Sequence, residues 1–535
     1  MAIRMTPDEG SSEQRRSTPD RRSGGGFSGG GGLGGLLPML IGLLLKNPKL
    51  LLLVAVGFGI FYFIGGSEGC NTGGAGANNV ISGLLQTVTG ANFDPKLYDR
   101  AEVYEPLADN VNAPLPERIS LESFAPERLN QGQQGSCVAW ASAYAARTIV
   151  QAKATGQKAD AVAFSPSYLY NQIKIDNSDC QGSYIFRAMD NMLKGGVLPF
   201  SKFAYTDQSC AKQPSIEERR TAEQYRIKGF QRLSLNGDDQ RTDMVAMKQQ
   251  LAQGSPVVIG MMVGGSFMQE MEGRELWTPT SSDYQQSGFG GHAMCVIGYD
   301  DYFVKGEKEG GAFQIMNSWG KEWGRNGIAW VRYSDFDFFA KEAYAVYPQS
   351  EDPNAKPAEF DIRFGLVLVD AKGRPTGEHI GLSRVDGRVF RSDRPIVKGS
   401  RFKVEVTNNA ECYTYIFGQV PDSTYVLFPY TAKHSPYCGI TGTRIFPKDY
   451  SLTADDMGQR DVMALLITNQ PFDYPKVNEQ LKAAPGGTMN AKLEGVLGQE
   501  LIPADAPVYS QGGTFGAKVP ATRNAMAIVL EIDKR

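Results

Sequence analysis

The stretch NQGQQGSCVAWASAYAARTIV, residues 130–150, opens with turn-forming Asn, Gln and Gly residues and continues into an alanine-rich run. Cys137 stands at the junction, and no Gly or Pro follows it in this stretch, so a helix is predicted to begin there. The positive end of a helix dipole lowers the pKa of a thiol and favours the nucleophilic thiolate. The alternative is an inert core thiol, because Cys is among the most buried residue types. Residues far from this stretch decide between the two.

A nucleophilic thiol needs a base, and His292 is the single histidine of residues 113–350, in GFGGHAMCVIGYDD. Imidazole can take a thiol proton near neutral pH and pass it to a leaving amine. Asn317 follows an apolar run in FQIMNSWGKEWGRNG and can accept the imidazole N–H, which fixes the tautomer. Gln131 precedes the thiol and can donate its amide N–H to a developing oxyanion, together with the backbone N–H of Cys137. These residues indicate covalent acyl-transfer chemistry.

The blocks NQGQQGSC, GHA…GY and NSWGKEWGRNG occur in the order found in papain-like cysteine peptidases, and residues 114–349 resemble that family. The resemblance implies a two-lobed α+β domain, with a helical lobe and a β-barrel-like lobe, that hydrolyses peptide bonds through a thioester. It implies Cys137 as the nucleophile, His292 as base and then acid, Asn317 as the group that orients the base, and Gln131 in the oxyanion hole.

The same resemblance gives expectations for the substrate site. Gly182, in CQGS, is expected to line the cleft for an extended peptide. Trp319 is expected at the substrate site, where it shields the Asn–His hydrogen bond from water. Cys180 and Cys210 resemble the ends of a bridged loop of the family, so a disulfide is expected between them. A family-type inhibitory propeptide is not apparent, which leaves the control of the enzyme open.

The first part of the chain predicts a membrane anchor. Residues 1–35 are polar and then glycine-rich, and we expect them to be disordered. Residues 36–66 are apolar, and the uncharged run over about 50–66 lies at the short end of the length that crosses a bilayer. The Arg and Lys residues before this run predict a cytoplasmic N-terminus and a periplasmic or extracellular catalytic domain on a single-pass protein. A signal sequence is the weaker alternative, because it would lie nearer the terminus.

Changes in composition mark the other boundaries. Residues 67–112 begin with Gly and Asn and are expected to be a linker. The peptidase-like domain follows over 113–350. The polar, Pro-containing segment EDPNAKPAE, residues 351–359, is expected to be a hinge between this domain and the rest of the chain.

Residues 360–535 consist of short alternating runs such as RFKVEVT and YTYIFGQV, which predict an antiparallel β-sandwich-like domain. This region loosely resembles a β-rich domain of unknown function attached to bacterial enzymes, which implies a bacterial origin and a binding or assembly role with an envelope protein. In an exported protein, Cys412 and Cys438 are a second disulfide candidate, because both lie in this domain. His379 and His434 are expected in surface loops, since Gly and Pro surround both.

Composition excludes some functions. The 535 residues include 55 basic and 58 acidic residues, and this near-neutral balance argues against a nucleic-acid binder. The three histidines contain no helical H-x-x-x-H pair, so neither a metal site nor another cofactor is expected. The prediction is a membrane-anchored cysteine endopeptidase with a polypeptide substrate. Two alternatives stay open: an envelope acyltransferase or peptidoglycan amidase with the same triad, and an inactive scaffold that acts through the β-rich domain.

Overall fold

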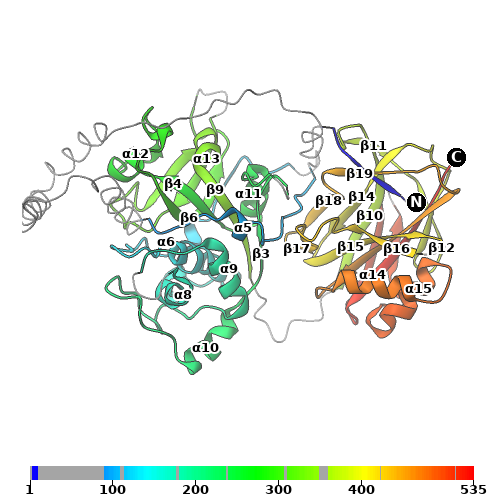
Figure 1. Cartoon of the computed structure of the whole chain (residues 1–535), viewed down its shortest axis with the longest axis horizontal. Coiled ribbons are helices and arrows are strands. Elements are labelled where there is room, and N and C mark those ends of the chain that lie inside the picture. Colours follow the sequence, from blue (N-terminus) through cyan, green and yellow to red (C-terminus); the bar gives the residue numbers. More distant parts are fainter. Residues whose placement is uncertain are drawn as a thin grey trace, which may run out of the picture. The chain divides into compact units, whose positions relative to one another are not determined.

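The chain divides into two compact units, Met1–Ser17 with Gly83–Arg535, and Thr18–Ser82. The computed structural model describes residues 3–9, 89–108, 114–175, 180–236, 239–305, 310–348, 359–421, 423–511 and 514–535, all of which belong to the first unit (Figure 1). The predicted anchor and nearly all of the predicted hinge lie outside these residues. Among the described residues, no helix is long and apolar enough to cross a membrane.

A continuous helical run begins at Cys137, as predicted. It comprises α6 (Cys137–Ala139), the π-helical η3 (Trp140–Arg147) and α7 (Thr148–Thr155), and it ends at Gly156, whose φ of 68° suits glycine. Six of its seven alanines are buried, all except Ala154, because small side chains let neighbouring elements approach the run closely. Three further helices complete this lobe: α8 (Pro166–Ile173), α9 (Ile185–Lys194) and α10 (Ile216–Ala222).

The second lobe is an eight-stranded sheet in the order β3-β9-β4-β6-β7-β8-β5, with β2 paired to β6. Strand β6 (Gly290–Asp300) carries His292 near its start, and β7 (Ala312–Met316) ends just before Asn317. The two strands pair antiparallel with Cys295 opposite Met316, so the start of β6 and the end of β7 meet at one edge. The other elements of this lobe are β2 (Arg118–Ser120), β3 (Ile227–Arg232), α11 (Met244–Ala252), β4 (Val257–Val263), α12 (Gly265–Gln269), β5 (Leu276–Trp277), β8 (Ile328–Arg332), α13 (Tyr333–Phe339) and β9 (Ala340–Pro348).

Residues 89–108, within the predicted linker, pack against this second lobe. Helix α5 (Pro95–Tyr98) starts after Asp94, whose side chain caps it, and Pro occupies the first helical position. Tyr98 is almost fully buried, and its hydroxyl lies within hydrogen-bond distance of both the N–H and the carbonyl of Ala343. The linker interpretation is therefore wrong for these residues, because tertiary contacts order a stretch that has no periodicity of its own.

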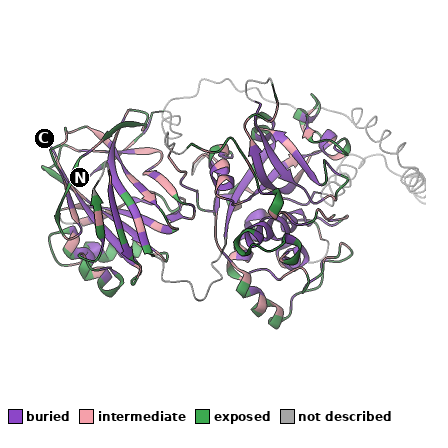
Figure 2. Cartoon of the chain, turned by 180° about the vertical axis from the view of Figure 1, so that it is seen from behind, coloured by how far each residue is buried: buried purple, intermediate pink, exposed green. Residues whose placement is uncertain are grey.

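The region after residue 359 is a β-sandwich, with apolar side chains of both sheets between them (Figure 2). Side chains alternate along the strands, so that Leu465 faces this core and Leu466 faces the opposite side. Two helices not predicted from the sequence, α14 (Tyr474–Ala483) and α15 (Met489–Leu497), cover that opposite side. Strands β13 and β23 pair in parallel, so the sandwich is not purely antiparallel.

The first sheet has the order β1-β19-β14-β10-β22-β21, with β11 on β10 and β18 on β14, and the second has the order β12-β13-β23-β20-β15-β16, with β17 on β15. The strands are β10 (Glu359–Val369), β11 (Pro375–His379), β12 (Leu382–Asp386), β13 (Val389–Ser392), β14 (Arg401–Asn408), β15 (Cys412–Val420), β16 (Ser423–Phe428), β17 (Tyr437–Cys438), β18 (Gly442–Phe446), β19 (Tyr450–Thr453), β20 (Arg460–Thr468), β21 (Val508–Gln511), β22 (Phe515–Pro520) and β23 (Ala525–Asp533).

The first described residues form strand β1 (Arg4–Pro7), which pairs antiparallel with β19 at the edge of the first sheet. Asp8 accepts a hydrogen bond from Lys403 Nζ at 2.7 Å and so pairs with an ammonium group that is almost fully buried. Residues 4–8 are therefore ordered, contrary to the prediction of disorder over 1–35. One bilayer crossing between β1 and the peptidase-like region is incompatible with this pairing, because it would put β1 and β19 on opposite sides.

The predicted disulfide between Cys412 and Cys438 is not formed. The two residues are direct register partners on β15 and β17, but both are free, buried thiols. The Cys438 thiol hydrogen-bonds locally, to the carbonyl of Pro436 at 3.8 Å and with the hydroxyl of Thr414 at 3.5 Å.

The surface-loop prediction for the other two histidines is also corrected. His434 is buried, with Nδ1 2.7 Å from the Glu105 carboxylate and its ring against Tyr430. His379 ends β11 and lies 3.2 Å from the carboxylate of Glu405. The Gly and Pro residues near these histidines are typical of turns, but they do not reveal which distant side chains contact the two imidazole rings.

Candidate active site

Cys137 begins the helical run, and its Sγ accepts a hydrogen bond at 3.5 Å from the backbone N–H of Ala293. The thiol therefore lies beside the residue that follows His292. It is fully buried, and burial raises the pKa of Cys137 to about 12, against the opposing effect of nearby backbone N–H groups. In this structure burial outweighs the helix start, and the thiol is protonated rather than the expected thiolate.

The pairing predicted between His292 and Asn317 is present. His292 Nε2 lies 2.7 Å from Asn317 Oδ1, which also accepts the backbone N–H of Ser318 at 2.7 Å. Because Oδ1 acts as the acceptor in both contacts, the ring donates through Nε2–H. The neutral ring then carries its lone pair on Nδ1, which is the form that a general base needs.

Burial also governs the state of the imidazole. It lowers the pKa of His292 to about 4, although hydrogen bonds from the protonated ring to Asn317 and Thr89 would act in the opposite direction. The ring of Trp319 stacks on the imidazole, with centroids 4.4 Å apart, and meets Trp323 edge-on. Trp319 therefore lies where the resemblance implied and covers the His–Asn pair.

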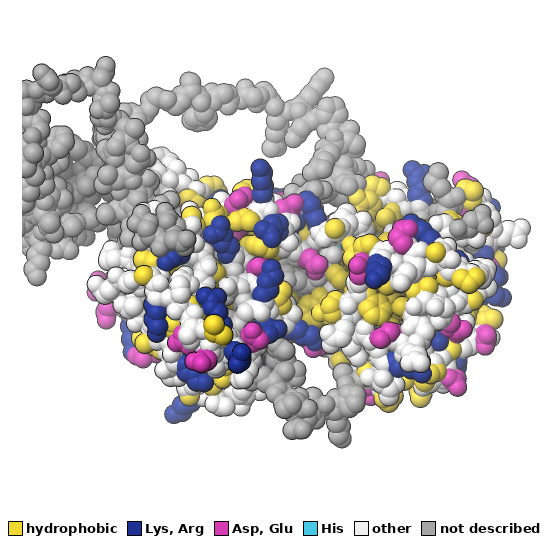
Figure 3. All heavy atoms as spheres, turned by 60° about the horizontal axis from the view of Figure 1, so that its bottom comes forward, with side chains coloured by type: hydrophobic (Ala, Val, Ile, Leu, Met, Phe, Trp, Pro, Cys, Tyr) yellow, Lys and Arg dark blue, Asp and Glu magenta, His cyan; other side chains and the backbone are white. Residues whose placement is uncertain are grey.

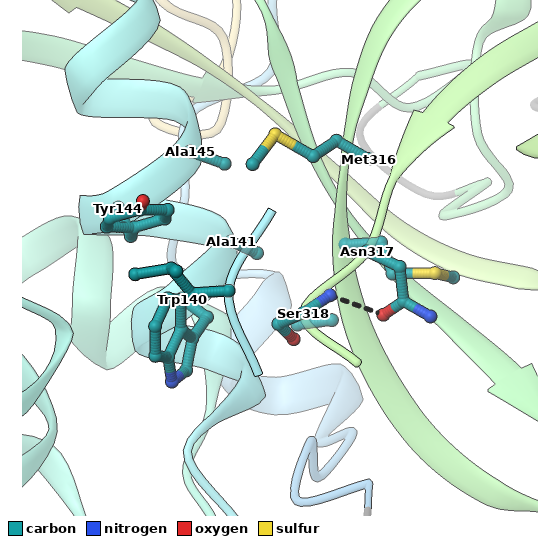
Figure 4. Close-up of a pocket in the computed structure, with 10 residues that line it drawn as sticks. Trp140, Ala141, Tyr144, Ala145, Met316, Asn317 and Ser318 are labelled. Carbon is teal, nitrogen blue, oxygen red and sulfur yellow. Dashed lines mark hydrogen bonds between the residues drawn. The ribbon is translucent and has the colours of Figure 1, made fainter. Parts of the chain in front are cut away.

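The lobes pack closely behind Asn317, where a gap of about 10 Å³ separates the helical run from the sheet. Figure 4 shows Trp140 and Tyr144 of the helical run on one side and Met316 and Asn317 on the other, with the hydrogen bond to Ser318 dashed. A gap of this size holds at most about one water molecule. It is therefore not a substrate pocket.

Gln131 is buried next to the thiol loop, and both ends of its amide are held. Nε2 donates to the carbonyl of Gln134 at 2.9 Å, and Oε1 accepts the hydroxyl of Ser318 at 2.7 Å. A primary amide has two N–H groups, and the bond to Gln134 uses one of them. Ser318 was not singled out from the sequence, although it stands in the NSWG block and fixes this amide.

Cys180 and Cys210 form a disulfide, as the resemblance implied. The bridge holds the loop before α9, in which Gly182 has a φ of 110° and donates its N–H to the hydroxyl of Tyr170. A Cβ on Gly182 would lie 2.4 Å from the carbonyl oxygen of Gly90. Gly182 therefore faces another segment of the same chain at close range.

That segment lies over the paired histidine. The carbonyl oxygen of Thr89 is 3.3 Å from His292 Nδ1, and the N–H of Ala91 donates to the carbonyl of Gly291 at 3.0 Å. The sequence analysis missed these contacts because TGANF, residues 89–93, contains no motif and no periodicity. The arrangement can perform acyl transfer when a substrate carbonyl, rather than Thr89, lies beside the thiol and the imidazole.

Within the described ranges, no group of three or more His, Cys, Asp or Glu side chains could hold a metal ion. On the face drawn in Figure 3, Lys and Arg side chains are interspersed with Asp and Glu.

Residues 122–348 match the family described as papain family cysteine protease. An uncharacterized peptidase C1-like protein of Acanthamoeba polyphaga mimivirus is 28% identical over 243 residues, which cover 44% of this chain and 70% of that protein. Cathepsin K of Mus musculus is 26% identical over 252 residues, 46% of this chain and 68% of its own length. Among solved structures, xylellain, a cysteine protease from Xylella fastidiosa, is 23% identical with a TM-score of 0.41, over 50% of this chain and 97% of that chain.

Proposed function

We propose that the papain-like cysteine peptidase domain of this chain, residues 122–348, is an endopeptidase that acts through Cys137, His292 and Asn317. The protein is a cysteine-type peptidase and therefore a hydrolase. The observation that supports the triad is the 2.7 Å contact between His292 Nε2 and Asn317 Oδ1. Ala293, the residue after His292 on β6, donates its backbone N–H to the Cys137 thiol.

The proposed first step is acylation. Nδ1 of His292 takes the proton of the Cys137 thiol, and the sulfur attacks the carbonyl carbon of the scissile peptide bond. The oxyanion that forms is stabilised by the backbone N–H of Cys137 and by Nε2 of Gln131. His292 then gives its proton to the leaving amine, the C–N bond breaks, and a thioester remains on Cys137.

The second step is hydrolysis. His292 takes a proton from water, the hydroxide attacks the thioester carbon, and the sulfur leaves and recovers its proton from the imidazolium. Asn317 keeps the ring in the tautomer that both steps require. In this proposal Gly182 lines the substrate cleft, and Trp319 covers the His–Asn pair beside the bound peptide.

A digest of a peptide library by the full chain and by its Cys137→Ala variant tests the proposal. Internal cleavage by the wild type alone supports an endopeptidase. Turnover of peptidoglycan amides or transfer to an added amine, without internal cleavage, would favour the envelope amidase or acyltransferase. If neither protein turns over any of these substrates and no thiol-reactive probe labels Cys137, the scaffold alternative replaces the proposal.

We also propose that residues 36–66 attach the protein to a bacterial membrane, on the strength of their apolar sequence. The disulfide between Cys180 and Cys210 supports a periplasmic or extracellular catalytic domain. Strand β1 pairs with β19, so in this proposal residues 4–7 and the rest of the described chain lie on the same side of the bilayer. Labelling of cysteines introduced at residues 2 and 535 in intact cells tests this topology. Both cysteines should react with a membrane-impermeant reagent, and a failure of either to react would contradict the proposal.

The role of the β-rich domain stays a proposal as well. We assign it the binding of an envelope protein, on the strength of its loose resemblance to a β-rich domain attached to bacterial enzymes. Cross-linking in the envelope with and without residues 360–535 tests whether partners depend on this domain.

A further inference from the structure

Tyr205 contacts both ends of the loop that carries the oxyanion donors. Residues 131–136, which we call the oxyanion loop, begin with Gln131 and end next to Cys137. The Tyr205 hydroxyl donates to the carbonyl of Gln131 at 2.7 Å and lies 2.7 Å from the hydroxyl of Ser136. A carbonyl oxygen only accepts, so Tyr205 gives its one hydrogen to Gln131, and Ser136 donates to Tyr205. One hydroxyl therefore links the two ends of the loop.

The contact with Tyr205 also directs the side chain of Ser136, which is the N-cap residue of α6. A serine at this position ordinarily accepts an N–H of the first helical turn with its hydroxyl. Here the side chain makes no capping bond, and its hydroxyl contacts Tyr205 instead. The Ser136 hydroxyl therefore does not compete with an oxyanion for the N–H groups at the helix start.

The backbone of Gln131 is held at both of its polar groups. Its N–H donates to the carbonyl of Ser318 at 2.8 Å, and its carbonyl accepts the hydroxyl of Tyr205. These two bonds fix the peptide units on either side of the Gln131 side chain, and so they fix the direction in which the amide leaves the backbone. Removal of the Tyr205 hydroxyl would leave the first bond and release the second.

Tyr205 is itself held in place. Its ring meets Trp140 of the helical run edge-on, with centroids 4.7 Å apart. The carbonyl of the next residue, Thr206, accepts the side-chain amide of Gln134 in the oxyanion loop at 3.4 Å. Burial raises the pKa of Tyr205 to about 12, so the hydroxyl keeps its hydrogen at neutral pH. The donor to the loop is therefore present and held in one orientation.

A disulfide links the segments that contact the oxyanion loop. A Cβ on Gly132 would lie 2.0 Å from Oδ2 of Asp207, so the segment that follows the tyrosine runs close to the loop. The N–H of Gly135 donates to the carbonyl of Cys180 at 3.2 Å. Cys180 is bonded to Cys210, which lies three residues after Asp207. The loop is therefore held by two segments that are joined covalently to each other.

We propose that Tyr205 is a positioning residue for the oxyanion site: its hydroxyl, between the carbonyl of Gln131 and the hydroxyl of Ser136, sets the distance between the two oxyanion donors. This inference rests on the proposed peptidase function and adds to it a residue that acts through the loop rather than on the substrate. The oxyanion exists only during the reaction, so the hydroxyl should affect turnover more than the binding of the peptide.

The test compares the full chain with Tyr205→Phe, which keeps the ring against Trp140 and removes only the hydroxyl. Tyr144→Phe is the matched control. The Tyr144 ring also packs edge-on against Trp140, and its hydroxyl also donates to a backbone carbonyl, that of Glu127 at 2.8 Å, outside the oxyanion loop. The control therefore loses a similar bond in the same lobe.

Three quantities are measured: kcat and KM for a fluorogenic peptide, and the rate at which iodoacetamide alkylates Cys137. In Tyr205→Phe, kcat should fall about tenfold or more, which is part of the loss that removal of a whole oxyanion donor causes. KM should stay within about twofold of the wild-type value, because the ground state contains no oxyanion. Alkylation should keep its wild-type rate, since displacement of iodide by the thiolate forms no oxyanion. Tyr144→Phe should leave all three unchanged.

A peptide aldehyde gives a readout that does not depend on turnover. The Cys137 sulfur adds to the aldehyde carbon and the aldehyde oxygen takes the proton, so the oxygen of the hemithioacetal lies where the oxyanion would form. Tyr205→Phe should weaken the binding of the aldehyde about tenfold. The corresponding peptide alcohol, to which the thiol cannot add, should bind equally to the wild type and the variant. In a Gln131→Ala background the effect of Tyr205→Phe should be smaller, because the two residues act together.

Equal kcat values in folded Tyr205→Phe and in Tyr144→Phe would overturn the proposal. A parallel fall in the alkylation rate would also overturn it, because it would show a general disturbance of the thiol. If Tyr205→Phe does not fold, Ser136→Ala removes the other end of the link and should give the same pattern, and a wild-type kcat in that variant would overturn the proposal. Aldehyde binding by a wild-type chain that hydrolyses no peptide would reject the peptidase function, whereas the aldehyde affinities would still test Tyr205, so the two failures are distinguishable.

Discussion

Gly90→Ala is the substitution whose effect follows most directly from the geometry. Gly90 has a φ of 83°, a conformation that costs an L-amino acid about 1–2 kcal/mol. Its new Cβ would also lie 2.3 Å from the carbonyl oxygen of Gly135, which is backbone and cannot rotate away. Residues 89–94 therefore have to lift away from Gly135. A total cost of about 2 kcal/mol or more shifts the equilibrium between their seated and lifted positions about 30-fold.

The assay is the second-order rate of Cys137 alkylation at pH 7.5, which should rise about 30-fold in Gly90→Ala. Gly156→Ala is the matched control, because Gly156 has a similar φ of 68° but no atom within 4 Å of the added Cβ. It should lose stability through backbone strain alone and keep the wild-type alkylation rate. If folded Gly90→Ala is alkylated at the same rate as Gly156→Ala, residues 89–94 do not limit the access of the reagent to the Cys137 thiol.

Three other predictions concern pH and stability. The pKa of His292 is about 4 while its ring is buried and should return towards 6.5 if residues 89–94 lift and expose the ring, so their seated position is fully favoured above about pH 6.5 and is weakened by up to about 3 kcal/mol as the pH falls to 4; amide exchange of Ala91 and Asn92, corrected for intrinsic rates, should increase over this range in the wild type but not in His292→Asn. Replacing Cys180 and Cys210 together by Ala should lower the free energy of unfolding by about 3.6 kcal/mol, because the disulfide closes a loop with a sequence separation of 30; coincident urea curves for the wild type and the double variant would contradict this. Burial raises the pKa of Glu342 to about 8, so the folded state holds a proton that the unfolded chain releases, and stability should fall as the pH rises from about 4.5 to 8; Glu342→Gln should melt higher than the wild type at pH 8.5, and a lower melting temperature there would show that the ionised carboxylate stabilises the fold.

The chemical groups of the site could be predicted because each belongs to a short block with a recognisable role. Cys137 at a loop–helix junction, His292 before an apolar strand and Asn317 after another are local features that the fold then brings together. The disulfide between Cys180 and Cys210 followed from the same resemblance. The β-rich character of the C-terminal region could be predicted from alternation along single strands.

What could not be predicted depends on contacts between distant segments. The pKa of the Cys137 thiol was expected to fall because the helix start is a local feature, but burial of the thiol in the folded chain raises it. Residues 89–94 are small or polar apart from Phe93, and their positions depend on hydrogen bonds with Ser183 and Gly291 rather than on a pattern of their own. His434 was misplaced for the same reason, because Glu105 lies 329 residues away in the sequence.

Strand β1 and helices α14 and α15 could not be predicted either, because contacts with distant residues order them. Residues 4–7 are too short a run to predict as a strand, and they are ordered by pairing with β19 and by the Asp8–Lys403 ion pair. Helices α14 and α15 cover apolar side chains that alternate with those of the sandwich core, which a strand pattern alone does not reveal.

The central claim of the proposed mechanism is that the Cys137 sulfur carries an acyl group during the reaction. The direct measurement is acid-quench mass spectrometry of the full chain, mixed with a slowly hydrolysed peptide ester and then mapped by peptide digestion. The proposed mechanism predicts a thioester adduct on the peptide that contains Cys137. This adduct should form more slowly in the His292→Ala variant and should be absent in the Cys137→Ala variant. An adduct on another residue, or ester and peptide hydrolysis that survives Cys137→Ala, would contradict it.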